Sequence, residues 1–352
     1  MHAMVEEKSG DKPVVWGVLG ASHFALMAAI PAMQQAPLVD LRALASRSLD
    51  KAKRAAASVN VTRAYGSYEE LVADPEIEAI YNPLPNNLHV SWSIKAARAG
   101  KHVLCEKPIA MSATEAEELA TVQRETGKLI AEAFMVRFHP QWDAVVQLIQ
   151  SGRIGKVRAV QTAFSYTNTD LDNIRNQKDV GGGALYDIGG YAINTARLIF
   201  GTEPKRVVGV CERDPNSGCD SLSSAILDFG SGQASFVVGT QHVPYQRVHI
   251  FGTKGHVEVE IPFNAPHDRP CKVYVDEGFV GSPDFTVAQS SDDRRELLPS
   301  VAANHYTRQW QAFSEAIRHG TPVKNDVQSA VANMRVIDAI FRSAESQRWE
   351  AV

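Results

Sequence analysis

The chain has 352 residues, 44% of them hydrophobic and 22% charged, which is typical of a folded globular protein and excludes a disordered or fibrous one. This length exceeds that of one ordinary domain, so we expect two domains. The formal net charge of -4 offers no basic surface to a phosphate backbone, so we expect no nucleic-acid partner and a small-molecule substrate instead.

The first residues and the cysteines bear on compartment and metal content. Met1–Lys12 are polar and lack the apolar core of a signal peptide, and no later run approaches a membrane span. We therefore expect a cytoplasmic protein with no membrane partner. The four cysteines, Cys105, Cys211, Cys219 and Cys271, lack metal-ligand spacing, so we expect them to be reduced and expect no metal site.

The first third of the chain alternates short apolar runs with helical patterns, which predicts βαβ units and a parallel sheet. The expected strands are Val14–Leu19, Val39–Ser46, Ala79–Asn82 and His102–Cys105. The expected helices are Ala25–Gln34, Leu49–Val59 and His89–Ala99. Capping boxes that begin at Ser67 and Ser112 mark two further helix starts. These elements predict a doubly wound α/β Rossmann domain over residues 12–135.

Consecutive strands replace this alternation after residue 135. The expected strands are Val157–Phe164, Arg206–Cys211, Ser223–Phe229, Gln233–Thr240, Arg247–Gly252 and His256–Glu260. The expected helices are Pro140–Ser151, Leu185–Phe200, Tyr306–His319 and Val327–Gln347. This pattern predicts an α+β domain over residues 136–352 with a large, mostly antiparallel open sheet, and we expect this domain to bind the substrate.

The turn after the first strand contains a variant of the dinucleotide fingerprint, Gly20-x-Ser22-x-x-Ala25. Serine replaces the middle glycine, and its hydroxyl can donate to a phosphate oxygen at the helix start. Alone, the motif is equally consistent with an ordinary tight turn. The expected pyrophosphate loop is Gly20, Ala21, Ser22, His23 and Phe24.

The end of the second strand indicates which dinucleotide is bound. An NAD enzyme places an acid there for the ribose 2′-hydroxyl, whereas this chain has Ser46 and Arg47, with Lys51 one turn further on. A cation at this position pairs with a 2′-phosphate, so we expect NADP(H) in preference to NAD. The alternative is a solvated surface arginine.

Pro85, Asn86 and His89 follow the strand Ala79–Asn82 at its carboxyl end, where open α/β sheets bind ligands. We expect them to face the cofactor crevice. For His89 the alternative is a residue that only caps the start of a helix.

Glu106 and Lys107 follow the next strand, and Pro108 holds Lys107 in an extended conformation that projects its side chain toward the same crevice. The alternative for Lys107 is an ordinary surface lysine. In the second domain Asp187 and Tyr191 are four residues apart and share a helix face after three glycines that permit close approach. The alternative for Asp187 is a residue that only caps the start of a helix. The alternative for Tyr191 is a half-buried aromatic at the domain interface.

Four motifs taken together resemble the glucose–fructose oxidoreductase, inositol dehydrogenase and rhizopine-catabolism family. They are Gly17-x-x-Gly20, Pro85-Asn86-x-Leu88-His89, Glu106-Lys107-Pro108 and the segment Gly181–Tyr191. The resemblance covers most of the chain. Tyr191 in place of a histidine and the segment Glu132–Phe138 are similar to the sugar branch, which includes aldose–aldose oxidoreductase and glucose–fructose oxidoreductase. Val136 departs from the tyrosine that this branch often carries.

The resemblance implies roles for five residues and a mode of assembly. Lys107 corresponds to the catalytic lysine and Tyr191 to the acid/base, with Asp187 beside them. Tyr166 and Arg175 lie in the segment that lines the substrate side, and Arg175 is also expected near the cofactor. The open sheet of the second domain implies a homodimer or higher homo-oligomer.

These expectations combine into an enzyme. We predict an NADP(H)-dependent oxidoreductase that converts cyclic aldoses to lactones at C1, with the possibility that a second sugar recycles a retained cofactor. Tyr191 exchanges the proton, Lys107 lowers its pKa and orients the hydroxyl, and Asp187 positions the pair. The alternatives are a trans-diol dehydrogenase or keto-sugar reductase of the same family, and a non-catalytic NADP-binding sensor.

Overall fold

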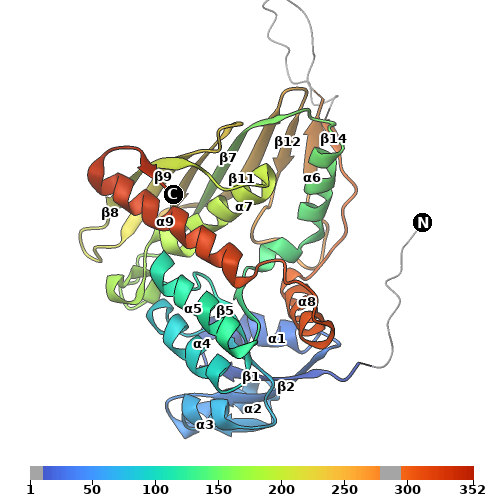
Figure 1. Ribbon diagram of the computed structural model, residues 1–352, viewed down its shortest axis with the longest axis vertical. Coiled ribbons are helices and arrows are strands. Elements are labelled where there is room, and N and C mark those ends of the chain that lie inside the picture. Colours follow the sequence, from blue (N-terminus) through green and yellow to red (C-terminus); the bar gives the residue numbers. More distant parts are fainter. Residues whose placement is uncertain (1–10, 278–294) are drawn as a thin grey trace, which may run out of the picture.

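The computed structural model describes residues 11–277 and 295–352, so the polar residues 1–10 lie outside it. Its lower layer is a parallel six-stranded sheet in the order β3-β2-β1-β4-β5-β6 (Figure 1). The strands are β1 Val14–Leu19, β2 Val39–Ala45, β3 Arg63–Tyr65, β4 Ala79–Asn82, β5 His102–Glu106 and β6 Ile130–Ala133. The strand order reverses between β1 and β4, which is where such sheets bind ligands.

Helices cover both faces of this sheet, as the alternating pattern predicts. They are α1 Ile30–Met33, α2 Leu49–Ser58, α3 Tyr68–Ala73, α4 His89–Arg98 and α5 Ala113–Thr126. The expected helix starts are confirmed, because Ser67 Oγ accepts from the amide of Glu70 at 3.1 Å and Ser112 Oγ accepts from that of Glu115 at 3.2 Å. The expected helix Ala25–Gln34 instead begins with a π-helical segment, η1 (Ala25–Ala29), before α1.

The upper layer is a nine-stranded sheet in the order β14-β13-β12-β11-β7-β10-β9-β8-β15. Its neighbours are antiparallel except for the parallel pair β7 and β10, which confirms the mostly antiparallel α+β domain. Its strands are β7 Val157–Thr167, β8 Arg206–Arg213, β9 Asp220–Asp228, β10 Gln233–Gly239, β11 Gln241–Gly252, β12 His256–Val259, β13 Val273–Asp276, β14 Arg295–Leu297 and β15 Glu350–Ala351.

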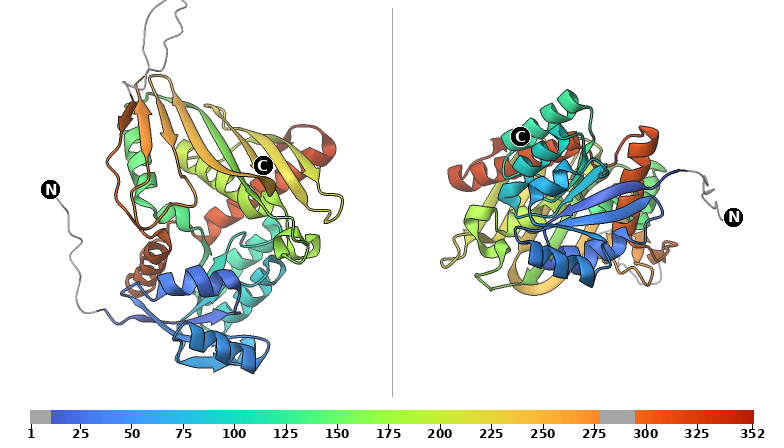
Figure 2. Two further views of the ribbon diagram at one scale, coloured as in Figure 1. Left: turned by 180° about the vertical axis from the view of Figure 1, so that it is seen from behind. Right: turned by 90° about the horizontal axis from the view of Figure 1, so that it is seen from below.

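Helices pack on one face of this sheet only (Figure 2). They are α6 Pro140–Gln150, α7 Gly190–Phe200 and α9 Val327–Ser346. Along β10, Phe236 and Val238 are buried toward the helices, whereas Val237 between them is 45% exposed. The opposite face of the sheet is therefore open and partly apolar.

The remaining long helix, α8 (His305–His319), lies near the end of the chain but packs on the first sheet. Trp310 and Phe313 lie 5.5 and 5.6 Å from the ring of Trp16 on β1. Arg318 at its end pairs with Glu78 at 2.8 Å, just before β4. The segment 136–352 thus supplies part of the core that encloses the Rossmann sheet.

Candidate active site

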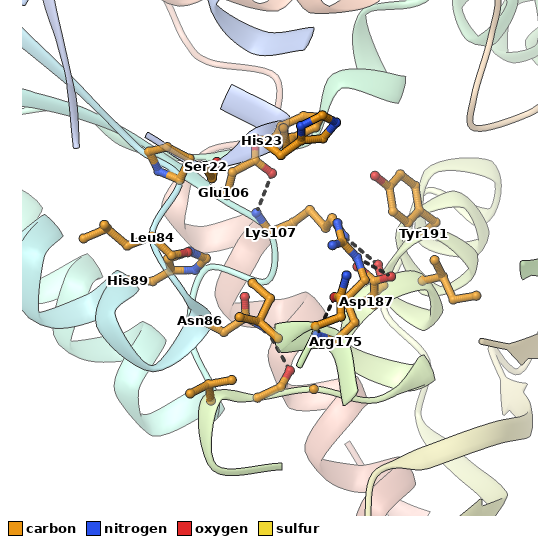
Figure 3. Close-up of a pocket in the computed structure, with 18 of the residues that line it drawn as sticks. Ser22, His23, Leu84, Asn86, His89, Glu106, Lys107, Arg175, Asp187 and Tyr191 are labelled. Carbon is orange, nitrogen blue, oxygen red and sulfur yellow. Dashed lines mark hydrogen bonds and ion pairs between the residues drawn. The ribbon is translucent and has the colours of Figure 1, made fainter. Parts of the chain in front are cut away.

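A cavity of about 570 Å³ lies between the carboxyl ends of the first sheet's strands and the second domain (Figure 3). It brings together eleven of the residues expected from the sequence: Ser22, His23, Phe24, Asn86, His89, Glu106, Lys107, Tyr166, Arg175, Asp187 and Tyr191. The other expected residues do not line it: Gly20, Ala21, Ser46, Arg47, Lys51 and Pro85. Most of that second group was assigned to the phosphate and ribose end of a dinucleotide.

Lys107 and Asp187 form the central ion pair of the cavity. Lys107 follows β5, and its Nζ donates to Asp187 Oδ1 and to the Asp187 carbonyl oxygen, both at 2.7 Å. Their side chains are only 15% and 13% exposed. Asp187 lies in η6 (Leu185–Gly189), a π-helical turn that runs into α7. Such turns are frequent at functional sites, and this one points both Asp187 and Tyr191 into the cavity.

Two further groups bond to the carboxylate of Asp187. Tyr166 on β7 donates its hydroxyl to Asp187 Oδ2 at 2.6 Å, and Arg175 Nε lies 3.3 Å from the same oxygen. Burial alone would raise the pKa of Asp187, but the charges of Lys107 and Arg175 and the hydrogen bonds of Lys107 and Tyr166 lower it well below its ordinary value. These contacts favour the carboxylate form of Asp187, which holds three side chains in place.

Tyr191 lies beside this cluster in an apolar setting. Its ring is 4.8 Å from Phe134 and 5.6 Å from Phe164, and its hydroxyl contacts Met135 Sδ at 3.6 Å. Burial, helped by nearby acidic groups, raises the pKa of Tyr191 well above its ordinary value. The expectation that Lys107 lowers this pKa is therefore wrong for this structure: the ammonium is neutralised by Asp187 and lies 5.4 Å from the ring centroid.

The turn after β1 has the geometry that a pyrophosphate requires. Gly20 has φ +94°, a conformation that side chains disfavour, and a Cβ there would lie 3.1 Å from Leu84. Ser22 is exposed, and its Oγ accepts from the amide of Ala25 at 3.1 Å, which leaves the hydroxyl hydrogen free to donate. The residues of this turn fit a dinucleotide-binding loop in which Ser22 takes the place of the middle glycine.

The end of β2 carries a cation and no acid. Ser46 is buried, whereas Arg47 is exposed and forms no ion pair with any acid in the described ranges 11–277 and 295–352. Ser48 caps α2 by accepting from the amide of Lys51. Arg47 is consequently available to a ligand at the edge where a dinucleotide ribose lies.

Asn86 and His89 are tied into the protein. Asn86 Nδ2 donates to the carbonyl of Gly181 at 2.8 Å and so bridges the two domains. The fully buried His89 has both ring nitrogens 2.7 Å from main-chain carbonyl oxygens, those of Pro108 and Leu84. It lines the cavity with its ring, and it fixes the loop that carries Lys107.

Glu106, half-buried at the end of β5, accepts from the hydroxyl of Tyr81 at 2.7 Å, and loss of solvent around its carboxyl raises its pKa. Several cavity residues were not predicted as site residues, among them Met135, Phe164, Asn264 and Tyr306. Met135 lies in the segment Glu132–Phe138, whereas the other three come from separate segments that carry no motif, so only the tertiary structure brings the four together. Among the described residues, no three metal-ligating side chains form a cluster. None of the helices in these ranges is long and apolar enough to cross a membrane.

A Rossmann sheet whose cavity holds a lysine, an aspartate and a tyrosine defines a nicotinamide-dependent oxidoreductase. Residues 14–134 match the oxidoreductase family with an NAD-binding Rossmann fold, and residues 142–258 match the GFO/IDH/MocA C-terminal domain. The chain belongs to this family, which confirms the resemblance of its motifs and makes it an NAD(P)-binding enzyme.

Named relatives cover nearly the whole chain. An uncharacterized oxidoreductase of Rhizobium meliloti is 44% identical over 96% of this chain and 99% of its own length. The D-xylose 1-dehydrogenase (NADP(+)) 2 of Haloferax volcanii is 35% identical over 95% and 98%. The dTDP-3,4-didehydro-2,6-dideoxy-alpha-D-glucose 3-reductase of Actinomadura kijaniata is 30% identical over 97% and 98%.

Solved structures of other oxidoreductases share the fold of this chain. A 3-ketoreductase from Actinomadura kijaniata, in complex with NADP and TDP-benzene, has a TM-score of 0.85 at 29% identity and covers 94% of this chain and 98% of its own. The aldose-aldose oxidoreductase from Caulobacter crescentus has a TM-score of 0.86 at 24% identity, covers 97% and 100%, and supports the fold alone.

Proposed function

We propose that this enzyme is an NADP(H)-dependent oxidoreductase of cyclic aldoses that acts at C1 and yields lactones. The observation that carries the proposal is the placement of Lys107, Asp187 and Tyr191 around one cavity at the carboxyl end of β5. The 35% identical D-xylose 1-dehydrogenase supports the substrate class and the cofactor.

The chemistry follows from the protonation states of the three residues. Tyr191 is a neutral phenol, so in the reducing direction it donates its proton to the carbonyl oxygen and becomes a phenolate. In oxidation the phenol must first give up its proton to solvent, and the resulting phenolate then takes the proton of the C1 hydroxyl. Lys107 donates a hydrogen bond to the same substrate oxygen, and Asp187 holds the ammonium in position. When bound, NADP(H) exchanges the hydride at C4 of its nicotinamide.

A second candidate is the reduction of a keto-sugar. The neutral phenol is already in the state that a reductase needs, and the 30% identical 3-reductase covers almost the whole chain. This second candidate uses the same residues, and it differs from the first in the direction of hydride transfer and in the substrate.

Stopped-flow mixing tests the aldose assignment. We expect glucose and xylose to reduce protein-bound NADP rapidly, and inositol and a cyclic trans-diol to do so poorly, since a site built to bond several hydroxyls rejects substrates that place them differently. The absorbance of reduced nicotinamide reports each reaction. Fast reduction by inositol or the diol, with none by either aldose, would overturn the aldose assignment and leave the oxidoreductase class intact.

The preference for NADP is tested at Arg47. We expect NADP to bind more tightly than NAD, and Arg47→Asp to weaken or reverse this order, because a carboxylate repels the 2′-phosphate and accepts from a free 2′-hydroxyl. Fluorescence titration with both dinucleotides measures the ratio. Arg158→Asp, at an exposed arginine on β7, is the control for a general charge effect. Equal or tighter binding of NAD by the unmodified protein would contradict the assignment.

We also propose that two copies associate through the open face of the second sheet. Val237 is 45% exposed and is paired in register with the small residues Ala163 and Ser224 on the flanking strands, which leaves room for side chains from a partner. Val237→Lys is expected to lower the sedimentation coefficient to that of a single chain. Leu171→Lys, at an equally exposed apolar residue in a loop, should leave it unchanged. A sedimentation coefficient that Val237→Lys does not alter would contradict this interface.

A further inference from the structure

A second cavity, of about 430 Å³, lies between η3 (Met135–Phe138) and the helices α6 and α7. It shares no lining residue with the catalytic cavity. Its walls are formed by Arg137, Trp142, Asp143, Val146, Gln147, Gln150, Leu198 and Lys324. Arg137 belongs to the segment Glu132–Phe138 that the sequence singles out, and the proposed chemistry makes no use of it.

Arg137 presents a positive charge without a directly paired carboxylate among the described residues: Asp143 acts on it through space, but pairs with Lys324 at 2.9 Å. Among the described residues its guanidinium has one hydrogen bond, from Nη1 to Asn194 Oδ1 at 3.3 Å, and no carboxylate of these ranges lies within 4 Å of it. Burial and the neighbouring Arg197 lower the pKa of Arg137. Arg197 itself is paired with Glu203 at 2.6 Å, so that carboxylate is engaged elsewhere. A half-buried cation in this state is stabilised by any anion that enters the cavity.

The guanidinium is held by a buried polar chain. Asn194 Nδ2 donates to Asn325 Oδ1 at 3.2 Å, and Asn325 Nδ2 donates to Glu132 Oε2 at 3.2 Å. All three side chains are almost inaccessible to solvent. Because these partners fix one another, the oxygen that orients Arg137 is itself fixed, which is how a preorganised binding group is built.

The remaining walls define what kind of anion fits. Val146 and Leu198 are apolar, and Lys324 adds a second cation that is balanced by Asp143 at 2.9 Å. The charged lining groups therefore sum to one excess positive charge, located at Arg137. This combination suits a ligand with one carboxylate and an apolar body better than an inorganic ion.

We propose that this cavity is a binding site, separate from the catalytic cavity, for a small organic acid. Its carboxylate bonds to the guanidinium of Arg137, and its apolar part lies against Val146 and Leu198. The site does not depend on the proposed sugar chemistry, because its lining residues and its charge are distinct from those of the catalytic cavity.

The probe for the test is 4-fluorobenzoate, followed by fluorine NMR on the full chain with NADP present. We expect saturable line broadening with 4-fluorobenzoate and none with 4-fluorobenzamide, its uncharged counterpart, and weaker binding of inorganic phosphate in competition. Arg137→Met is expected to weaken the probe's binding at least tenfold, since the charged hydrogen bonds are lost. Val146→Trp fills the cavity and keeps the charge of Arg137. It should also weaken the probe's binding at least tenfold, so the test does not depend on correct folding of Arg137→Met alone.

Two controls locate the probe. Arg158→Met removes an exposed arginine and should leave the dissociation constant unchanged, and Arg175→Met removes the arginine of the catalytic cavity and should also leave it unchanged. Loss of binding in Arg175→Met alone, or unaltered binding in both Arg137→Met and Val146→Trp, would overturn the proposal. None of these readouts requires turnover, so a failure of the aldose assignment leaves this test intact.

Discussion

Lys107→Ala is expected to lower kcat/KM for the aldose roughly a thousandfold, while the affinity for NADP changes little. The substitution removes the ammonium that bonds to the reacting oxygen, an effect of about 10²–10³ for one lost donor. It also removes one of the contacts that hold the side chain of Asp187, since Nζ of Lys107 donates to it at 2.7 Å. Steady-state rates and a dinucleotide titration measure the two quantities separately.

The same substitution should destabilise the protein, because Asp187 is left buried with one counterion fewer. Breaking a buried pair in this way costs about 3–5 kcal/mol, although Arg175 and Tyr166 still bond to the carboxylate and reduce that loss. Lys107→Arg keeps the charge, so it should recover most of the stability but not the rate. A folded Lys107→Ala variant with near-normal turnover would remove Lys107 from the chemistry.

Tyr191→Phe is expected to reduce turnover by about a hundredfold or more, the scale for the loss of a general acid/base. The fold should hardly change, because the ring packs against Phe134 and Phe164 and the hydroxyl contacts only a sulfur atom among the described residues. Binding of NADP should also be retained.

Tyr166→Phe is the matched control, since it removes a second phenol from the same cavity. Its hydroxyl donates to Asp187 at 2.6 Å, so its loss weakens one hydrogen bond of the cluster, roughly a tenfold effect. Single-turnover kinetics of both variants would rank them. Equal losses, or a larger one in Tyr166→Phe, would mean that Tyr191 is not the proton donor.

The alternation of apolar runs was sufficient to predict four of the six strands of the first sheet and six of the nine strands of the second. The bounds of β1 and β4 match the expected ranges, because each is a fully buried run flanked by turn residues. The strands β3, β6, β13, β14 and β15 were missed. Of these, β3, β14 and β15 have only three, three and two residues, too few to show a period of two. The pairing of β3 with β2 and of β15 with β8 depends on neighbours that are distant in the sequence.

The positions of Lys107, Asp187 and Tyr191 followed from motifs, but the electrostatics of the cavity did not. Sequence spacing brings Asp187 and Tyr191 to one face, and it cannot tell which of them Lys107 will contact. In the structure the ammonium of Lys107 pairs with the carboxylate of Asp187, which is a better acceptor for an ammonium than the phenol of Tyr191 is. The raised pKa of Tyr191 is caused mainly by burial, which sequence spacing does not reveal either.

The return of α8 to the first sheet has a consequence for the order in which the protein is made. Trp16 packs against Trp310 and donates to Ser314, so the core around β1 stays incomplete until the last part of the chain is synthesised. At about 5–20 residues per second, the roughly 170 residues between the Rossmann sheet and α8 take on the order of ten to thirty seconds to appear. During that interval the nascent chain exposes an indole surface, which is the kind of patch that chaperones bind.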